Sequence, residues 1–250
     1  MSEQRQRVAI VTGGSRGIGR RVAERLAASG TAVVVTYQTA AASAEEVVER
    51  IRAQGGRASA VGADVADPAS VAHLFAAAEE IFGGVDIVVH AAGVLTKKPL
   101  VELSVEEIDA MLHTNLRGTL LVSQRAAVHL RNGGSIINFS TAVTKVLAPG
   151  YTAYVATKAG LEAAGKVLAR ELAGRNITVN VVAPGPTESD MLASDLDSSP
   201  DPAAARRWME DATPLGRLGT PDDIADVVLA LTGSMPWVNG QVIHSSGGFV

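Results

Sequence analysis

The chain has 250 residues, of which 47% are hydrophobic and 19% charged, and its formal net charge is −4. This composition is typical of a globular protein with a large core, and because Lys and Arg occur singly rather than in clusters, it excludes a nucleic-acid-binding surface. Cysteine is absent, which excludes disulfides, thiolate nucleophiles and the usual zinc sites and favours a reducing cytoplasm.

The first residues, "MSEQRQR", are polar, and the apolar run after them is too short for the core of a signal peptide. No stretch approaches the roughly 18 apolar residues of a membrane span. The five histidines show no ligand spacing. We therefore expect a cytoplasmic protein that has no membrane segment and no catalytic metal.

Short apolar runs rich in β-branched residues alternate along the chain with longer segments in which apolar residues recur every three or four positions. The short runs predict strands at residues 7–13, 32–37, 58–64, 85–93, 134–140, 177–185 and 240–248. Strands that are apolar throughout are buried on both faces, as in a parallel sheet between layers of helices. The sequence therefore predicts a single α/β domain, a doubly wound Rossmann fold whose seven-stranded parallel sheet has helices on both faces.

The longer segments at 18–29 and 44–54 predict helices. The residue types at the ends of such segments predict Ser43 and Ser70 as N-caps, and Gly30, Gly55 and Gly56 at helix ends. Residues 193–221 break the pattern, because they are rich in Pro, Ser and Asp, with one short helix around 206–210. We expect an irregular substrate-binding loop at about residues 187–217.

The loop after the first strand, "TGGSRGIG" (12–19), has glycines at positions 13, 17 and 19 and opens a helix. Glycines allow a sharp turn and a close approach to a pyrophosphate, whose charge then lies on the free N–H groups of the helix N-terminus. A glycine-rich turn without a ligand is the alternative, which the strand–turn–helix context disfavours.

The end of the second strand, "TYQT" (36–39), lacks the acidic residue that would bind the adenine ribose of NAD. Without that negative charge a 2′-phosphate is tolerated, and Arg16 in the glycine loop is placed to bind it. We therefore expect NADPH or NADP, rather than NAD, as the cofactor.

Together, "TGGSRGIG", "HAAG" (90–93), Asn115, Ser140 and "YVATK" (154–158) resemble the short-chain dehydrogenase/reductase family. The resemblance covers essentially the whole chain, including "NVVAPGP" (180–186) and "NGQVIHSSGG" (239–248). Within the family the chain is most similar to ketoreductases of the 3-oxoacyl-carrier-protein and hydroxynaphthalene types. The resemblance implies an NADP-dependent oxidoreductase that acts on a small-molecule ketone, free or linked to a carrier protein, and that assembles as a homotetramer.

Tyr154 and Lys158 are one helical turn apart and suit carbonyl reduction. Hydride transfer to a carbonyl carbon generates an alkoxide that must be protonated. A phenol has a pKa of about 10, and a cation one turn away is expected to lower it. Tyr154 is then the general acid, and the resemblance implies that Lys158 also holds the nicotinamide ribose and that Asn115 supports a water-linked proton path. Taken alone, the pair is equally compatible with a half-buried tyrosine covered by a lysine.

The carbonyl also needs a hydroxyl donor to polarise it. The family uses a serine at the end of the fifth strand, thirteen or fourteen residues before the tyrosine, and both Ser140 and Thr141 fit that spacing. Neighbouring strand residues face opposite sides, so only one of them points into the pocket. Ser140 is preferred on residue identity, and Thr141 remains the alternative.

The remaining cofactor contacts are predicted at the ends of the strands. The full set of expected cofactor-binding residues is Gly13, Ser15, Arg16, Gly17, Ile18, Gly19, Tyr37, Asp64, Val65, Ala91, Gly93, Tyr154, Lys158, Pro184, Gly185 and Thr187, with Ser189 beside the last of these. Ala91 replaces an amide that is common in the family and is expected to change packing, and His90 is expected to be structural.

Apolar side chains are expected to enclose a ketone with an apolar or aromatic body. These are Leu147, Tyr151, Met191 and the Trp208–Met209 pair, with Tyr151 lining or closing the pocket. One alternative is an alcohol or sugar dehydrogenase that works oxidatively. A second is a non-catalytic cofactor-sensing protein, which has no need of a complete Asn–Ser–Tyr–Lys set.

Overall fold

The seven expected strands form one sheet in the computed structural model of the protein, which describes residues 5–250. The first four residues, where the polar "MSEQRQR" segment begins, lie outside the described residues. All strand pairs are parallel, in the order β3-β2-β1-β4-β5-β6-β7. The strands are β1 (Val8–Thr12), β2 (Ala32–Tyr37), β3 (Ala58–Gly62), β4 (Val85–His90), β5 (Leu130–Phe139), β6 (Thr178–Pro184) and β7 (Val242–Ser245).

The central strands β1 and β4 are buried along their whole length, which is the property that their predominantly apolar sequences predict. The predicted doubly wound parallel sheet is therefore confirmed. The largest boundary error is at β5, which begins at Leu130 rather than at residue 134. Its first residue pairs with Val85 of β4 through a register irregularity, and this pairing lies beyond the reach of an apolar-run criterion.

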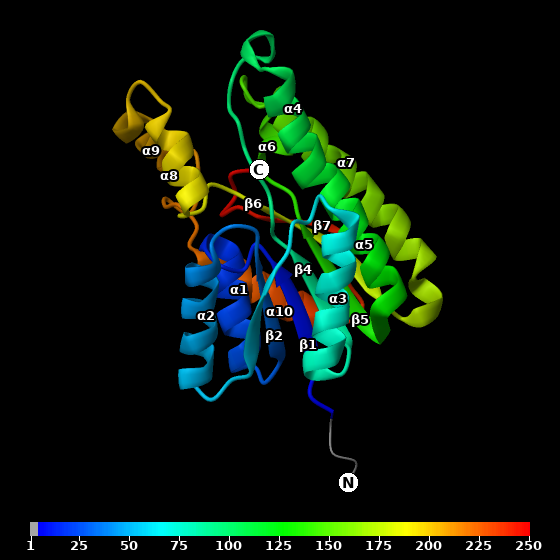
Figure 1. Ribbon diagram of the computed structural model, residues 1–250. Helices are drawn as coiled ribbons and strands as arrows, with labels where there is room; N and C mark the ends of the chain where they lie inside the picture. The colour runs from blue at the N-terminus through cyan, green and yellow to red at the C-terminus, as the bar shows by residue number, and fades with distance from the viewer. Residues whose placement is uncertain (1–4) are drawn as a thin grey trace.

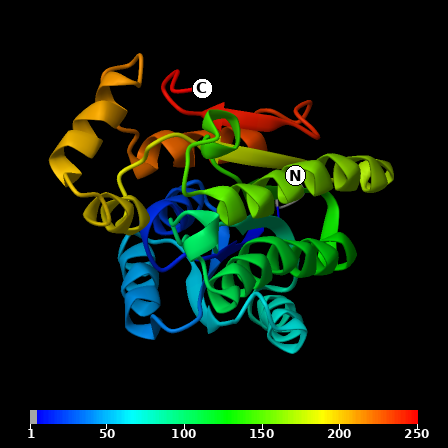
Figure 2. The ribbon, with the colours of Figure 1, turned by 90° about the horizontal axis from the view of Figure 1, so that it is seen from above.

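Helices cover both faces of the sheet (Figures 1 and 2). The α-helices are α1 (Gly17–Ala28), α2 (Ala41–Ala53), α3 (Pro68–Phe82), α4 (Val105–Met111), α5 (Gly118–His129), α6 (Val143–Val146), α7 (Thr152–Glu171), α8 (Asp190–Asp197), α9 (Pro202–Asp211) and α10 (Pro221–Thr232). One core cluster joins α1, α2 and α10 to the sheet, and a second joins α3, α5 and the end of α7 to its other face. Within residues 5–250, no helix combines the length and apolarity that a membrane span requires.

The helix ends correct two predictions. Helix α2 begins at Ala41, so Ser43 lies inside the helix rather than capping it. Asp67 caps α3 by accepting hydrogen bonds from the N–H groups of residues 69 and 70, while the hydroxyl of Ser70 accepts one from the Asp64 N–H. In both cases a serine near the helix start was mistaken for the cap itself. The predicted glycine ends are confirmed at Gly30 and Gly55, whose φ angles are positive just after α1 and α2.

The segment expected to be irregular contains two helices instead. Helices α8 and α9 occupy residues 190–211, and each begins at a side-chain cap, from Ser189 and Asp201 respectively. A proline follows the second cap at the first helical position, which is a helix-start signal present in the sequence. At the base, Thr187 pairs with Gly219 in a parallel bridge. We call residues 188–218 the α8–α9 arm; it extends beyond the layers of the domain (Figure 1).

Candidate active site

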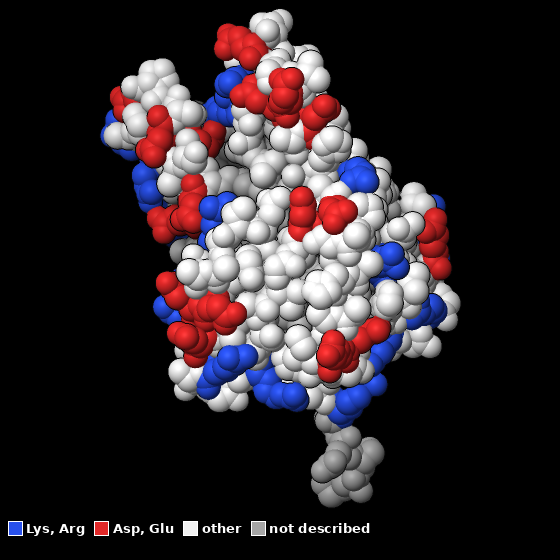
Figure 3. All heavy atoms as spheres, in the orientation of Figure 1, with Lys and Arg blue, Asp and Glu red and all other residues white. Residues whose placement is uncertain are grey.

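The carboxyl ends of the parallel strands open into a cavity of about 1140 Å³ between the sheet edge and the α8–α9 arm. In Figure 3 a hollow separates the arm from the rest of this face of the molecule. A cavity of this volume exceeds what one drug-sized ligand needs. Every residue that we expected to bind the cofactor lines it, and so do Ser140 and Thr141, whereas Asn115 does not.

The glycine loop forms a cradle at one end of the cavity. Gly13 has a φ of +64°, and a Cβ there would lie 2.9 Å from the backbone nitrogen of Ala92. A Cβ at Gly19 would lie 2.2 Å from the carbonyl oxygen of Gly13, so neither position accepts a side chain. Helix α1 has no side-chain cap, which leaves the N–H groups of its first turn facing the cavity for an anion. These residues fit the pyrophosphate of a dinucleotide.

The adjoining wall carries the features expected for a 2′-phosphate. Tyr37, Gln38 and Thr39 line the cavity at the end of β2, without a carboxylate among them, and Asp64 and Val65 line it after β3. The side chain of Arg16 is exposed and lines the same cavity. Among the residues that the structure describes, it forms no ion pair. A phosphate therefore meets a guanidinium here and no acidic residue of β2.

Helix α7 brings Tyr154 and Lys158 to the cavity, with 6% and 5% of their surfaces exposed. The ammonium nitrogen of Lys158 donates a hydrogen bond of 2.8 Å to the carbonyl oxygen of Phe139 and lies 5.7 Å from the centre of the Tyr154 ring. Burial penalises the charged form, which lowers the pKa of Lys158 to about 8. This lysine is thus a cation that loses its proton at mildly alkaline pH.

The pKa of Tyr154 is raised to about 12, which differs from the expectation that Lys158 lowers it. Burial of the phenol is the largest cause; the polar side chain of Thr141 lowers the pKa, and the charge of Asp195 raises it. The ammonium of Lys158 donates to a backbone carbonyl, and burial decides the pKa of the phenol. In the protein alone Tyr154 is therefore fully protonated at neutral pH, as a proton donor must be.

The structure separates the two candidate hydroxyls at the end of β5. The hydroxyl of Ser140 donates a 2.5 Å hydrogen bond to Oε1 of Glu162 on α7, which also accepts one from Thr144. Oγ1 of Thr141 accepts a 3.3 Å hydrogen bond from the N–H of Val143, and the residue lines the cavity together with Tyr154. The hydroxyl of Ser140, the residue preferred on identity, therefore donates to a carboxylate, while Thr141 lies on the same side of the pocket as Tyr154.

Asn115 is fully buried in a π-helical turn (Leu112–Arg117) behind the cavity. Its side-chain oxygen accepts a 2.8 Å hydrogen bond from the Val94 N–H, and its amide nitrogen donates one of 2.8 Å to the Val94 carbonyl. The amide is thereby engaged on both sides. What this geometry supports is positioning of the segment after β4, rather than direct contact with a ligand.

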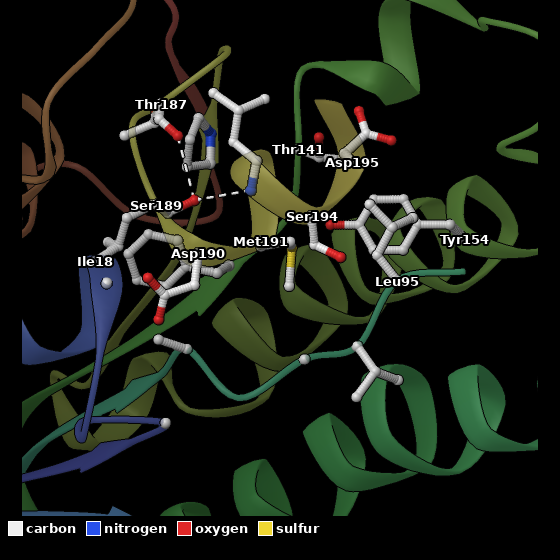
Figure 4. Close-up of a pocket in the computed structure, with 18 of the residues that line it drawn as sticks. Ile18, Leu95, Thr141, Tyr154, Thr187, Ser189, Asp190, Met191, Ser194 and Asp195 are labelled. Atoms are coloured by element: carbon white, nitrogen blue, oxygen red, sulfur yellow. Dashed lines mark hydrogen bonds between the residues drawn. The ribbon is translucent and has the colours of Figure 1, made fainter. Parts of the chain in front are cut away.

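The substrate end of the cavity lies opposite the glycine loop. In Figure 4, Thr141, Tyr154 and Leu95 lie on one side of the pocket, and Ile18, Thr187 and Ser189 lie on the other. Thr187 and Ser189 are held by local hydrogen bonds, to the carbonyl of Gly185 and to the N–H of Leu192 respectively.

Of the apolar residues expected to enclose a ketone, all but one line the cavity: Tyr151, Met191, Trp208 and Met209. Leu147 does not, because it ends α6 in a left-handed conformation and is 68% exposed. The sequence-based prediction missed Lys97 and Asp195, which also line the cavity. No spacing marks either residue, since both are brought in by segments without a motif.

His90 is buried below the cavity, where its Nδ1 lies 2.8 Å from the hydroxyl of Thr12. Burial, followed by the charge of Lys158, lowers its pKa to about 3, so the ring is neutral. It does not line the cavity, whereas Ala91 does. In the described part of the chain, no group of three or more acidic or histidine side chains is arranged to hold a metal ion.

Known proteins resemble this chain over almost its whole length. Residues 13–250 match the family described as enoyl-(acyl carrier protein) reductase. An uncharacterised oxidoreductase of Methylorubrum extorquens is 44% identical over 99% of this chain and 99% of its own. The hydroxynaphthalene reductase-like protein Arp2 of Metarhizium majus is 38% identical over 98% of this chain and 95% of its own.

A solved structure of a short-chain dehydrogenase from Burkholderia cenocepacia J2315 in complex with NADP is also similar. It is 38% identical, with a TM-score of 0.90 over 99% of both chains. Full-length similarity at this identity, together with the glycine loop and the Tyr154–Lys158 pair, establishes that the chain is an oxidoreductase of the short-chain dehydrogenase/reductase family.

Proposed function

We propose that the protein is an NADPH-dependent carbonyl reductase that converts a ketone into a secondary alcohol. The observation that carries the proposal is that Thr141 and Tyr154 lie on one side of the cavity, at its substrate end, with the buried cation of Lys158 one turn further along α7. Two adjacent hydroxyl donors suit an oxygen that gains negative charge during the reaction.

NADPH fits the residues at the other end. The glycine cradle and the N-terminus of α1 would hold its pyrophosphate, Arg16 its 2′-phosphate, and Lys158 and Thr187 its nicotinamide half. NADP in the Burkholderia relative supports this choice. When bound, the cofactor supplies hydride to the carbonyl carbon.

The residues of this chain then stabilise and protonate the carbonyl oxygen as it becomes negatively charged. Thr141 donates a hydrogen bond to the oxygen and polarises the carbonyl. Tyr154, protonated at neutral pH, donates its proton to the developing alkoxide. The ammonium of Lys158 stabilises the negative charge left on the phenol oxygen until a proton is restored. Ser140 takes no part in these steps, because its hydroxyl donates to Glu162. Asn115 fixes the cavity wall at Val94 by accepting a hydrogen bond from the Val94 N–H.

The function is tested at neutral pH by following NADPH consumption with an acetoacetyl thioester and with a bicyclic aromatic ketone, and NADPH formation when a sugar or alcohol is supplied with NADP. Turnover of either carbonyl compound supports the proposal. Turnover confined to the reverse reaction would favour the oxidative dehydrogenase. Tight NADPH binding without turnover of any compound would contradict the proposal and favour a cofactor-sensing protein.

The roles of the two hydroxyls at the end of β5 can be separated by matched substitutions. We expect Thr141→Val to lower kcat about 10- to 100-fold, because one hydrogen bond to a charged oxygen is lost, while Thr141→Ser retains activity. Ser140→Ala is expected to leave kcat near the wild-type value and to lower the free energy of unfolding by about 1 kcal/mol, through loss of the Glu162 contact. Steady-state kinetics and urea unfolding measure both. The reverse pattern would assign Ser140 to the carbonyl.

Arg16 accounts for the expected preference for NADPH over NADH. We expect Arg16→Ala to raise the KM for NADPH about tenfold, which corresponds to loss of one charge-assisted contact with the 2′-phosphate, and to leave the KM for NADH unchanged. Arg170→Ala, an exposed arginine on α7, is the matched control. Equal losses with NADPH and NADH would contradict the assignment.

The proposal extends to a homotetramer in the cytoplasm. Exposed apolar side chains at Leu120 and Val128 on α5 and at Val167 on α7 support contact between copies of the chain. The absence of cysteine is compatible with a reducing compartment.

A further inference from the structure

Three polar side chains from three separate segments meet at the substrate end of the cavity. Asp195 of α8 accepts a 2.7 Å hydrogen bond through Oδ2 from the hydroxyl of Tyr151, which immediately precedes α7. The ammonium nitrogen of Lys97, from the segment after β4, lies 3.2 Å from Oδ1 of Asp195 and 5.2 Å from the centre of the Tyr151 ring. All three residues line the cavity. The carboxylate of Asp195 and the ammonium of Lys97 thus lie in a wall of the cavity that is otherwise formed largely by apolar side chains such as Leu95 and Met191.

One oxygen of this carboxylate is short of a hydrogen bond. Asp195 is only 8% exposed, and its Oδ1 is buried and accepts no hydrogen bond from the residues that the structure describes. Lys97 lies close enough to attract the charge but does not have hydrogen-bond geometry. Buried carboxylate oxygens are normally satisfied by donors. A donor that enters the cavity with the substrate would complete the set.

Asp195 also lies close to the reacting groups. Its charge raises the pKa of Tyr154, and the rings of Tyr151 and Tyr154 are 6.4 Å apart, centre to centre. When the carbonyl oxygen of a ketone lies at Tyr154, the far side of a ring attached to that carbonyl therefore lies near Asp195. A hydroxyl group on a cyclic or aromatic body occupies that place, whereas a simple 3-oxoacyl chain carries no donor there.

We propose that Asp195 is a specificity-determining residue that accepts a hydrogen bond from a hydroxyl group of the ketone, so that the substrates are hydroxylated cyclic or aromatic ketones. This inference rests on the proposed carbonyl reductase function and narrows its substrate class. Tyr151 and Lys97 hold the carboxylate in place. A ketone without the hydroxyl leaves Oδ1 of the buried carboxylate without a hydrogen-bond donor, and a site built for a hydroxyl discriminates strongly against analogues that lack it.

The alternative for Asp195 is a purely structural contact that fastens the α8–α9 arm to Tyr151 and Lys97. Loss of such a contact lowers the activity toward all ketones by the same factor. The ratio of activities toward two ketones that differ only in one hydroxyl group therefore separates the two roles.

The experiment compares a bicyclic aromatic ketone, the derivatives of it that carry one ring hydroxyl at different positions, and the methyl ether of each derivative. The hydroxylated derivatives are positional isomers of one another. We expect at least one hydroxylated isomer to exceed both its methyl ether and the parent ketone in kcat/KM by about tenfold or more. Asp195→Asn, which preserves the volume of the side chain and an acceptor for Tyr151, is expected to reduce this ratio about tenfold. Asp197→Asn, an exposed carboxylate on the same helix, is the matched control and is expected to keep the ratio.

The results distinguish this inference from the function on which it rests. If the wild-type enzyme reduces the parent ketone, the hydroxylated isomers and the methyl ethers equally well, the role of Asp195 is overturned and the carbonyl reductase stands. An unchanged ratio in Asp195→Asn also overturns it. If no ketone is reduced although NADPH binds, both proposals fail. Should Asp195→Asn not fold, the comparison of hydroxyl with methyl ether in the wild-type enzyme still decides.

Discussion

Tyr154→Phe is expected to lower kcat for ketone reduction by about 10²–10⁴-fold while leaving NADPH binding intact. The substitution removes only the hydroxyl that donates the proton to the alkoxide, and the aromatic ring keeps its packing against Tyr151. Steady-state kinetics measure the loss, and quenching of NADPH fluorescence measures binding. The two readouts separate the chemical step from assembly of the site.

The thermal midpoint serves as the control for folding. The pKa of Tyr154 lies well above neutrality, so the phenol is uncharged in the folded protein and its loss removes no buried charge. We therefore expect a midpoint close to that of the wild-type protein. A variant that folds, binds NADPH and reduces ketones at the wild-type rate would show that another group donates the proton.

Lys158→Met is expected to lower kcat by about 10²–10³-fold and to make the protein more stable at neutral pH. The activity falls because the cation that stabilises the phenolate is removed. The stability rises because a buried ammonium, which has a single hydrogen bond to Phe139, is replaced by an apolar side chain of similar length. The pKa shift of Lys158, from 10.5 to about 8, corresponds to up to about 3 kcal/mol in the free energy of unfolding.

The sign of the pH dependence follows from that shift. Between about pH 8 and pH 10.5 the unfolded chain binds this proton more strongly than the folded protein does, so stability rises with pH over this interval. The cost of burying the cation is fully present below about pH 8 and disappears above the pKa of the unfolded state. Lys158→Met abolishes this contribution, which urea unfolding at pH 7 and pH 10 measures.

Lys166→Met is the control for this prediction, because Lys166 is exposed on the same helix. We expect it to change neither kcat nor the free energy of unfolding beyond about 0.5 kcal/mol. A loss of stability in Lys158→Met as large as the loss from a core cavity would mean that the ammonium is compensated by more than the Phe139 carbonyl.

The succession of strands along the chain was predictable from the sequence because the central strands are short runs rich in apolar, β-branched residues. Residues 32–37, for example, form β2 with the predicted bounds. The start of β5 was not predictable, because Leu130 joins the sheet through a pairing with Val85 that depends on tertiary contact. The N-cap of a helix was predicted wrongly where several polar residues near the helix start could each cap it, as with Asp67 and Ser70.

The α8–α9 arm was interpreted as irregular because its composition is rich in Pro, Ser and Asp. The same residues are favourable at helix starts, as Ser189 and Asp201–Pro202 show. Average composition over a segment concealed this positional information. Helix α9 then begins earlier than the short helix expected near residue 206.

The candidate site was predictable wherever the spacing along one element decides the geometry, as for Tyr154 and Lys158. The choice between Ser140 and Thr141 stayed open in the sequence, because Glu162, which accepts the hydrogen bond of the Ser140 hydroxyl, lies on another element. Asp195 and Lys97 were missed because their meeting depends on how the arm folds over the sheet. The raised pKa of Tyr154 in the protein alone was not predicted, since burial of the phenol cannot be read from a spacing.

The bridge between Thr187 and Gly219 has a consequence for how the substrate range of this fold can evolve. The N–H of Glu188 donates to the carbonyl of Gly219, and the N–H of Gly219 donates to that of Pro186, so the arm leaves and rejoins the domain at one point. When the ends of a segment are already held together, doubling its length costs only about 0.6 kcal/mol in chain entropy. Residues 188–218 can therefore be exchanged for longer or shorter segments as a module, while the sheet, the glycine loop and the Tyr154–Lys158 pair remain unchanged.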